Sequence, residues 1–352
     1  MKRYIPVILV LAFSLMNSSE LHAQLFKRRV NKSVNFTIEQ LAPRVWAAIQ
    51  NDFYGKAICN AGIIDLGNKT LVFDPFLSPS AARELNIIAK QLTHKPVSIV
   101  VNSNYHNDHI RGNQVFLPNA SIMSTSITRE EMERIEPEEQ AWEKAYAPTL
   151  LEAVHKRSIN SNATDRDEMP YWVGYYEALV ESSDELFLAL PDVVFDDSLW
   201  IMGSKLSVQL VERKNGNTIS DAVLLIPKYG IAFMGDLLCN ERHPWMSDGN
   251  VHGWRQSLKT YYEDTLYTTY LPGHGKVAGK AALRSLYEYL GDVQALCDAA
   301  QTDSAQSALL LQPIPAAYRG WYFGRFYQPN LQYLLSLSKQ KTQGTLKTVS
   351  KQ

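Results

Sequence analysis

The chain has 352 residues, of which 45% are hydrophobic and 20% charged, and its formal net charge is −1 at pH 7. This length and composition predict a globular protein with a large core. The balanced charge argues against a nucleic-acid partner, so we expect a small-molecule substrate; nothing in the composition indicates an oligomeric state.

Residues 1–23 have the pattern of a secretory signal peptide. Lys2 and Arg3 precede an apolar stretch at residues 5–16, and small Ala23 precedes Gln24. The apolar stretch is too short for a permanent membrane span. We therefore expect a periplasmic or secreted protein with no stable membrane anchor after cleavage; an uncleaved anchor is the alternative.

Short apolar runs separated by turn residues predict strands at residues 45–49, 57–65 and 70–73. A helix is predicted over residues 78–92, because Leu85, Ile88 and Leu92 fall on one face. A further strand is predicted at residues 97–101. The order strand, turn, helix, strand is typical of an α/β fold.

A cluster of ligand-type side chains follows the strand at residues 97–101. His106, Asp108 and His109 lie within four positions, and imidazole with carboxylate is a ligand set that Zn²⁺ prefers. The simpler alternative is a polar turn in which Asp108 or Asn107 caps the next helix.

Residues 122–193 are predicted to contain two helical stretches. Thr128 and Glu131 form a capping-box pattern, Pro137 and Pro148 are expected to break or restart the first helix, and the second is predicted at residues 171–181. The stretches carry aromatic residues that either pack in the core or form a lid over a site: Trp142, Tyr146, Trp172, Tyr175 and Tyr176.

Later strands also end near polar side chains. Asp236 follows an apolar run at residues 231–234, and His274 lies in a glycine-flanked loop after Tyr270-Leu271. Because α/β folds assemble sites beyond the ends of their strands, we expect both to approach the first cluster. Helices are predicted at residues 254–263 and 280–301, and the polar tail at residues 339–352 is predicted to be disordered.

Four motifs occur in a fixed order: N-Y-H-N-D-H at 104–109, G-N-T at 216–218, G-D-L at 235–237 and P-G-H-G at 272–275. In this order they resemble the motifs of the metallo-β-lactamase-fold hydrolases, over about residues 35–290. The resemblance implies an α/β fold, an αββα four-layer sandwich of two mixed β-sheets flanked by helices. A single domain at residues 24–338 would then carry the helical insertion at about residues 122–193.

The resemblance also implies a metal site with one position complete and one degraded. The second metal position of the family corresponds to Asp108, His109, Asp236 and His274. The first would use residues 104, 106 and 217, which here are Asn104, His106 and Asn217. Neutral amides cannot replace the imidazole donors that hold zinc. We therefore predict one Zn²⁺ and not two.

By the same resemblance, the activity is hydrolysis of an ester, lactone, amide or similar bond by a metal-activated water. His106 would act as general base with Asp108 steering the proton, while Asn104 and Asn217 orient the substrate. Arg111 would bind an anionic substrate or pair with a surface carboxylate. The alternatives are a catalytically inactive binding protein of the same fold and a β-lactamase.

Other candidate groups are weaker. The three cysteines, Cys59, Cys239 and Cys297, allow one disulfide at most, and Cys239 is expected to be a small buried residue. His243 and His252 could supply a missing ligand, although loop histidines are more often solvated or hydrogen-bonded. Asp74, by resemblance, lies behind the metal ligands, or else it only forms a turn with Pro75.

Overall fold

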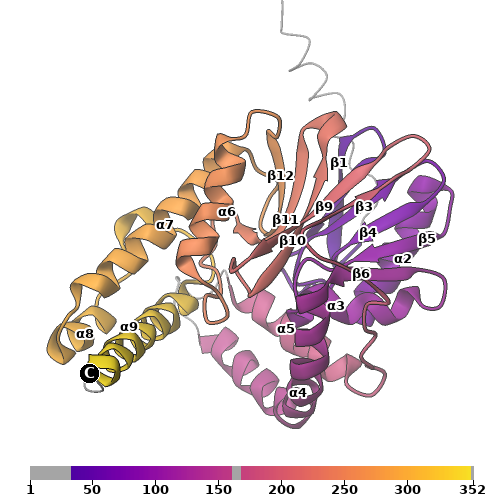
Figure 1. Ribbon diagram of the computed structural model, residues 1–352. Coiled ribbons are helices and arrows are strands. Elements are labelled where there is room, and N and C mark those ends of the chain that lie inside the picture. Colours follow the sequence, from indigo (N-terminus) through magenta and orange to yellow (C-terminus); the bar gives the residue numbers. More distant parts are fainter. Residues whose placement is uncertain (1–32, 161–167, 350–352) are drawn as a thin grey trace, which may run out of the picture.

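Two mixed β-sheets pack face to face in the computed structural model of the protein, which describes residues 33–160 and 168–349 (Figure 1). The predicted signal peptide lies outside the described residues. Helices cover the outer faces of both sheets, so the predicted αββα architecture is confirmed.

The first sheet has seven strands in the order β1-β2-β3-β4-β5-β6-β7. Strands β1 to β4 are antiparallel neighbours, and β4 to β7 run parallel. Their bounds are β1 Phe36–Ala42, β2 Val45–Gln50, β3 Ala61–Asp65, β4 Thr70–Phe73, β5 Val97–Val101, β6 Ser121–Thr125 and β7 Val193–Phe195. The strand predicted at residues 57–65 therefore begins four residues later, at Ala61.

The second sheet has five strands in the order β12-β11-β10-β9-β8, with only β11 and β12 parallel. Their bounds are β8 Ser198–Ile201, β9 Val208–Lys214, β10 Ser220–Ile226, β11 Ile231–Cys239 and β12 Thr269–His274. Strand β11 continues through Asp236, which we had predicted to follow the strand. Gly235 adopts a left-handed φ of +52°, and the pairing with β12 shifts register there, so Asp236 projects from an irregularity within the strand.

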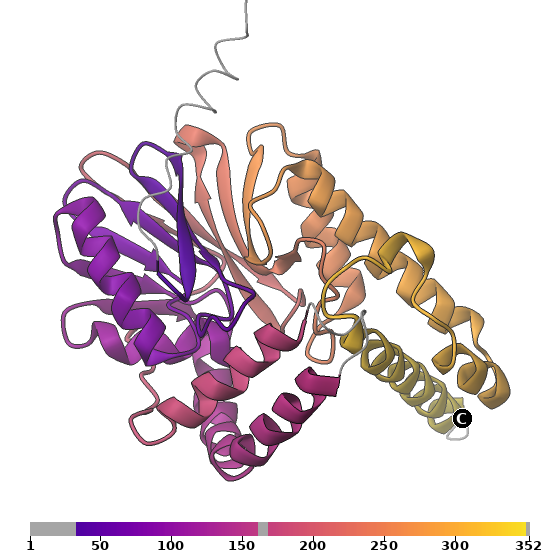
Figure 2. The ribbon, with the colours of Figure 1, turned by 180° about the vertical axis from the view of Figure 1, so that it is seen from behind.

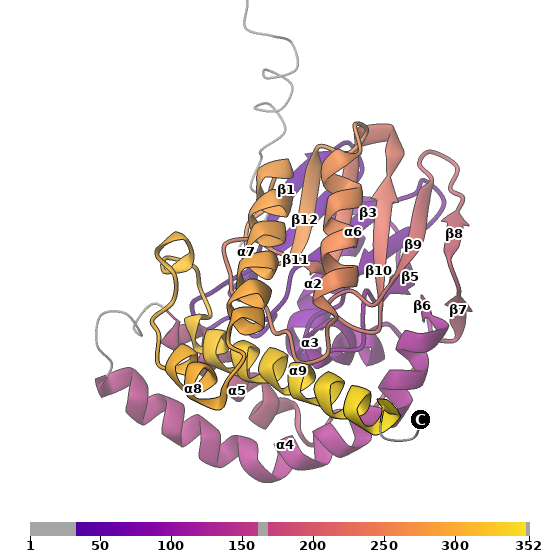
Figure 3. The same ribbon diagram turned by 60° about the vertical axis from the view of Figure 1, so that its left-hand side comes forward.

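Apolar layers explain why the sheets stack. Side chains such as Leu71, Phe73 and Phe233 fill the space between the two sheets. Helix α2 (Pro79–Thr93) covers the first sheet, and helices α6 (Val251–Glu263) and α7 (Lys280–Ala299) run along the outer face of the second (Figure 3). Each layer removes apolar surface from water, which is the main favourable term in folding.

Helix α2 shows how local sequence sets an element. Ser78 caps it by accepting a hydrogen bond from the Ala81 N–H, Pro79 occupies the first turn, and His94 ends it in a left-handed conformation. Its buried face includes Leu85 and Ile88, as the spacing predicted.

The insertion folds into two helices, α4 (Ser126–Asn160) and α5 (Met169–Ser182), which lie side by side below the sheets in Figure 2. The prediction that Pro137 and Pro148 break the first helix was wrong, because both lie inside α4. Packing of α4 against α5 compensates for the backbone hydrogen bonds that proline removes. The predicted capping role of Thr128 was also wrong: the Thr128 N–H donates to Thr125 Oγ1, so Thr125 caps the helix.

The chain ends in helices α8 (Asp303–Leu310) and α9 (Tyr327–Val349), joined by the short 3₁₀ helices η3 (Ala316–Tyr318) and η4 (Gly324–Phe326). Helix α9 reaches Val349, so most of the tail that we predicted to be disordered is helical instead. Among the described residues, no helix is both long and apolar enough to cross a membrane.

Candidate metal centre

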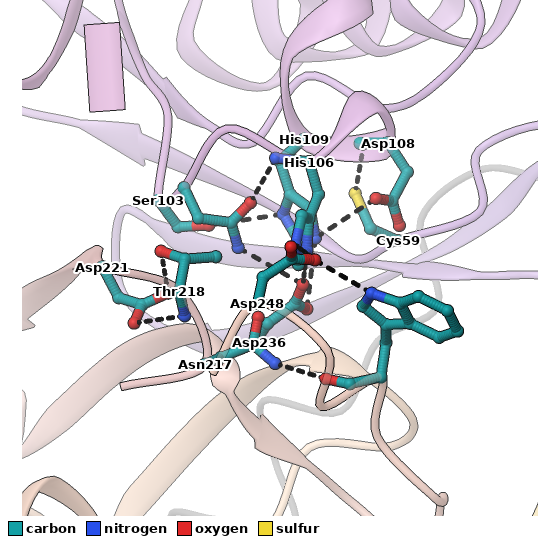
Figure 4. A network of polar contacts seen from close by, with 12 residues as sticks. Cys59, Ser103, His106, Asp108, His109, Asn217, Thr218, Asp221, Asp236 and Asp248 are labelled. Atoms are coloured by element: carbon teal, nitrogen blue, oxygen red, sulfur yellow. Dashed lines mark hydrogen bonds and ion pairs between the residues drawn. The ribbon is translucent and has the colours of Figure 1, made fainter. Parts of the chain in front are cut away.

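The predicted ligands come from three separate parts of the fold and meet where the two sheets open. Asp108 and His109 lie in the short helix α3 (Asn107–Ile110), which follows β5 of the first sheet. Asp236 comes from β11 and His274 from the end of β12, both in the second sheet. Figure 4 shows Asp108, His109 and Asp236 drawn together from these elements.

The side-chain atoms of these four residues surround one point. His109 Nε2 lies 3.1 Å from Asp236 Oδ1 and 3.7 Å from Asp108 Oδ1. His274 Nε2 lies 3.2 Å from Asp236 Oδ1 and 3.4 Å from Asp108 Oδ2. Metal–ligand bonds of about 2.0–2.1 Å in a tetrahedral zinc site place neighbouring ligand atoms about 3.3 Å apart. His109, Asp236 and His274 therefore offer ligand atoms at separations that fit one tetrahedral cation, and Asp108 approaches His109 and His274 through different oxygens.

Two further observations fit a cation at this point. His109 Nε2 and Asp236 Oδ1 are buried and have no hydrogen-bond partner in the described part of the chain. Buried polar atoms rarely remain unpaired, so both indicate a missing partner between them. Gly273 also leaves this space open, because a Cβ there would come within 2.2 Å of Asp236 Oδ1.

Groups behind the four residues fix their orientation. His109 Nδ1 lies 2.9 Å from Asp74 Oδ2, and the Ser103 N–H donates to Asp74 Oδ1 at 2.7 Å. His274 Nδ1 donates to the Ile58 carbonyl oxygen at 3.2 Å. Such contacts hold the other ring nitrogen toward a metal. Asp74 thus lies behind His109, where the resemblance placed it.

The imidazoles and carboxylates of the site shift one another's pKa values. Burial alone would raise the pKa of Asp236, but His109 and His274 outweigh it and hold that pKa well below its usual range. Burial alone would lower the pKa of His109, but the neighbouring carboxylates raise it well above its usual range. An uncompensated charge in this buried position would be costly, and a divalent cation between neutral imidazoles would balance the two carboxylates.

His106 lies beside these four residues and does not share their central point. Its Nδ1 is 3.1 Å from Asp236 Oδ2, and its Nε2 is 3.4 Å from Asp248 Oδ2. Burial would lower the pKa of His106, but hydrogen bonds with Asp236 and Asp248 raise it to about 10. The imidazole therefore occupies, as a cation, the side of Asp236 that faces away from the four-residue site.

The two asparagines have different surroundings. Asn104 is fully buried: its Nδ2 donates to Asp236 Oδ2 at 3.3 Å, and its Oδ1 accepts from the His106 N–H. Asn104 was predicted to orient the substrate, but it does not line the cavity described below. It connects Asp236 to the backbone of His106 instead. Asn217 lines that cavity; its Nδ2 donates to the Trp245 carbonyl oxygen, and its buried Oδ1 has no partner among the described residues.

Arg111 also differs from its predicted role. Its side chain is 2% exposed, and it pairs with Glu136 and Glu143 of α4, each at 2.5 Å. It does not line the cavity at the metal centre. Arg111 therefore links the segment that follows α3 to helix α4 of the insertion through two buried carboxylates. It does not pair with a surface carboxylate, the alternative considered above.

Sequence patterns missed two neighbours of the site. The Cys59 thiol donates to the Asp108 carbonyl oxygen at 2.9 Å, and its Sγ lies close to the ligand atoms of Asp108 and His109. Asp248, on the loop before α6, contacts His106. Neither belongs to a motif; the only available signal for Asp248 was the polar loop after β11.

The remaining candidates lie away from the central point. His243 is fully buried between Tyr289 and the Tyr318 carbonyl oxygen, and His252 contacts Gln256 on α6. Neither supplies a ligand here. Cys59, Cys239 and Cys297 are all free and buried, so the one possible disulfide is not formed.

A cavity of about 560 Å³ opens over the metal centre. Asp108, Asp236 and His274 form part of its floor, and aromatic side chains from α5 and the C-terminal region form much of its wall. These are Tyr171, Trp172, Tyr175, Tyr176, Phe323 and Phe326. Trp142 and Tyr146 instead lie exposed on α4 and contact each other. The aromatic residues of the insertion therefore divide between the cavity wall and the outer surface.

The fold has close counterparts among solved structures. A metallo-beta-lactamase from Pontibacter korlensis matches with a TM-score of 0.53 and 13% identity, covering 73% of this chain and 99% of its own. A metallo beta lactamase from Erythrobacter litoralis matches with a TM-score of 0.52 and 13% identity, covering 75% of this chain and 100% of its own. The DIM-1 metallo-beta-lactamase matches with a TM-score of 0.51 and 12% identity, covering 73% of this chain and 98% of its own. At these identities the likeness shows the fold alone.

The sequence itself carries the family assignment. No curated protein matches the chain, but a family model described as the metallo-beta-lactamase superfamily matches residues 54–318. This range covers three quarters of the chain and includes all four residues around the central point. The chain belongs to the metallo-beta-lactamase superfamily, whose members are mostly metal-dependent hydrolases.

Proposed function

We propose that the protein is an exported metal-dependent hydrolase that uses one zinc ion to cleave an ester, lactone, amide or similar bond in a small molecule. Asp108, His109, Asp236 and His274 would hold the zinc. The observation that carries the proposal is the convergence of their ligand atoms at separations of 3.1–3.7 Å. Export is proposed from the signal-like pattern of residues 1–23 alone.

The contacts of the two Asp236 carboxylate oxygens support the proposal of a single metal. Oδ1 faces His109 and His274, whereas Oδ2 faces His106 and Asn104. A second cation at Oδ2 would have to displace the His106 ring, and the amides at residues 104 and 217 offer no imidazole in return.

Zinc, when bound, supplies a Lewis acid and a coordinated water of lowered pKa. The chain's own residues must hold the substrate and move protons. His106 and Asp248 both line the cavity, and their 3.4 Å contact places a protonated imidazole and a carboxylate beside the space that a reacting group would occupy. Asn217 lines the cavity, and its Oδ1, buried and unpaired among the described residues, would accept a hydrogen bond from a substrate only after a small shift of the side chain.

Metal analysis of the full chain tests the proposal. After zinc loading and dialysis, we expect close to one equivalent of zinc and hydrolysis of at least one member of a panel of aryl esters, lactones and anilides. The variants Asp236→Ala and His274→Ala should lose both zinc and activity. His252→Ala, at an exposed position on α6, is the matched control and should retain both. Absence of zinc from the loaded protein contradicts the proposal, and stoichiometric zinc without hydrolysis indicates a binding protein instead.

A further inference from the structure

Three glutamates on α4 share a single arginine partner. Glu136, Glu139 and Glu143 are spaced three and four residues apart on α4, which places them on one face of the helix. Arg111 pairs with Glu136 through Nε and with Glu143 through Nη1. A single guanidinium thus serves two buried carboxylates, and Glu139 is left over.

Glu139 is the member of this set that lines the cavity. Among the described residues, no cationic group lies within ion-pair distance of its carboxylate. Burial raises the pKa of Glu139 to about 7; the repulsion from Glu136 acts in the same direction, and the attraction of Arg111 and His106 opposes it. A carboxylate in this position is stabilised by a cation brought in by a ligand.

The wall beside Glu139 is aromatic. Trp172, Tyr175 and Tyr176 line the same cavity, and the rings of Tyr175 and Tyr176 meet at 84° with their centroids 5.2 Å apart. Perpendicular rings form a corner that offers an aromatic face to a ligand. Cations bind such faces, and quaternary ammonium groups are recognised by several rings together.

One ring of the cavity already contacts a cation. The Arg325 guanidinium lies 4.3 Å from the centroid of the Trp172 ring, so the rings of Tyr175 and Tyr176 are the ones left for a ligand. Among the described residues, the buried unpaired atoms of side chains that line the cavity include the acceptor Asn217 Oδ1 and the donors His106 Nε2 and Trp172 Nε1. Of the described cavity groups without an ion-pair partner, the Glu139 carboxylate is the one that suits a cation.

We propose that Glu139 and the rings of Tyr175 and Tyr176 form a subsite for an ammonium group. The substrate is then a small ester or amide that carries an amine or quaternary ammonium at one end and places its scissile bond over the metal centre. The hydrolytic part of this statement depends on the function proposed above. The binding part does not, since it can be measured without turnover.

Calorimetry on the zinc-loaded full chain tests the subsite. The probes are choline, its uncharged isostere 3,3-dimethylbutan-1-ol, and the anion 3,3-dimethylbutanoate. We expect choline to bind about tenfold or more tightly than the uncharged isostere, as the combined effect of the rings and the carboxylate. Glu139→Gln should reduce this preference several-fold, leaving only the part that the rings supply. Glu138→Gln, at the exposed neighbouring position on α4, should retain it.

Each outcome of this experiment either supports or overturns the proposed ammonium subsite. Equal binding of choline and the uncharged isostere, or no binding of either, overturns the subsite. Preference for the anion that disappears in Arg325→Gln also overturns it, because Arg325 then selects the ligand. Circular dichroism of Glu139→Gln separates loss of binding from loss of folding. Selective binding of choline without hydrolysis of any choline ester or amide leaves the subsite standing and counts against the proposed function.

Discussion

His106 Nδ1 lies 3.1 Å from Asp236 Oδ2, so the aspartate that faces the metal centre through one oxygen faces an imidazole through the other. In this arrangement a protonated side chain compensates the second oxygen of Asp236. The amides of Asn104 and Asn217 are compatible with it because they carry no charge. The departure from the family pattern at residue 104 thus belongs to the same local change, because Asn104 contacts both Asp236 and His106.

The Asp74–His109 contact should control zinc affinity. Asp74→Asn keeps the shape of the side chain but removes the charge that orients His109 from 2.9 Å away. Loss of such a carboxylate behind a ligand typically lowers metal affinity by about 10–100-fold. We expect this decrease in competition with a chromophoric chelator, and no change for Asp298→Asn on the exposed side of α7. Unchanged affinity in Asp74→Asn would show that His109 is oriented by other groups.

The buried ion pairs of Arg111 should be required for stability. Arg111→Met leaves Glu136 and Glu143 buried without their cation, and breaking a buried pair by removing one partner typically costs about 3–5 kcal/mol. We expect a decrease of this size in the free energy of unfolding in urea. Glu133→Gln, which breaks the exposed pair with Arg129, should change it by less than about 1 kcal/mol. Similar values for the two variants would mean that the buried cluster contributes little.

The sequence predicted the parts of the site that depend on local pattern and motif order. Asp108 and His109 follow a strand, and Asp236 and His274 occupy motifs far along the chain. The structure brings all four together. The layered sandwich was predictable for the same reason, since apolar runs of strand length alternate with turn residues in a familiar order.

The errors concern contacts that no local pattern encodes. Arg111 looked available for substrate because its partners, Glu136 and Glu143, lie on a helix inserted after it. Asp248 is one acidic residue in a polar loop, and only the fold places it beside His106. Pro137 was expected to end a helix, yet packing of α4 against α5 outweighs the local preference.

His243 should make stability depend on pH. Its fully buried ring has a pKa lowered to about 4 by burial, whereas an unfolded histidine has a pKa near about 6.5. The unfolded chain therefore binds the proton more readily between these values. The stability that neutral His243 provides is complete above the unfolded pKa and is lost as the pH falls toward the folded pKa.

A difference experiment isolates this effect from other titrating groups. Between pH 7.5 and pH 5, His243 should remove about 2 kcal/mol from the free energy of unfolding of the natural protein. His243→Gln cannot take up the proton, so its stability should fall by about 2 kcal/mol less over the same interval in urea titrations. Parallel pH dependence of the two proteins would mean that His243 can be protonated within the folded state without cost.

Asp248 should affect catalysis without affecting zinc. Its carboxylate lies 3.4 Å from His106 Nε2 and accepts a hydrogen bond from Trp245 Nε1, so it both orients the imidazole and stabilises its protonated form. Asp248→Asn should therefore lower kcat by about tenfold to a hundredfold, within the range that general acid–base groups contribute, and change KM much less.

The variant should also lower the pKa that controls kcat, because a neutral amide in place of the Asp248 carboxylate no longer favours protonated His106. Zinc content, measured by mass spectrometry, should remain at the natural value, since Asp248 is not among the residues that surround the central point. A decrease of kcat with an unchanged pH profile would assign Asp248 a purely structural role in its loop. A parallel loss of zinc would mean that Asp248 helps to hold the metal and that His106 is not the group through which it acts.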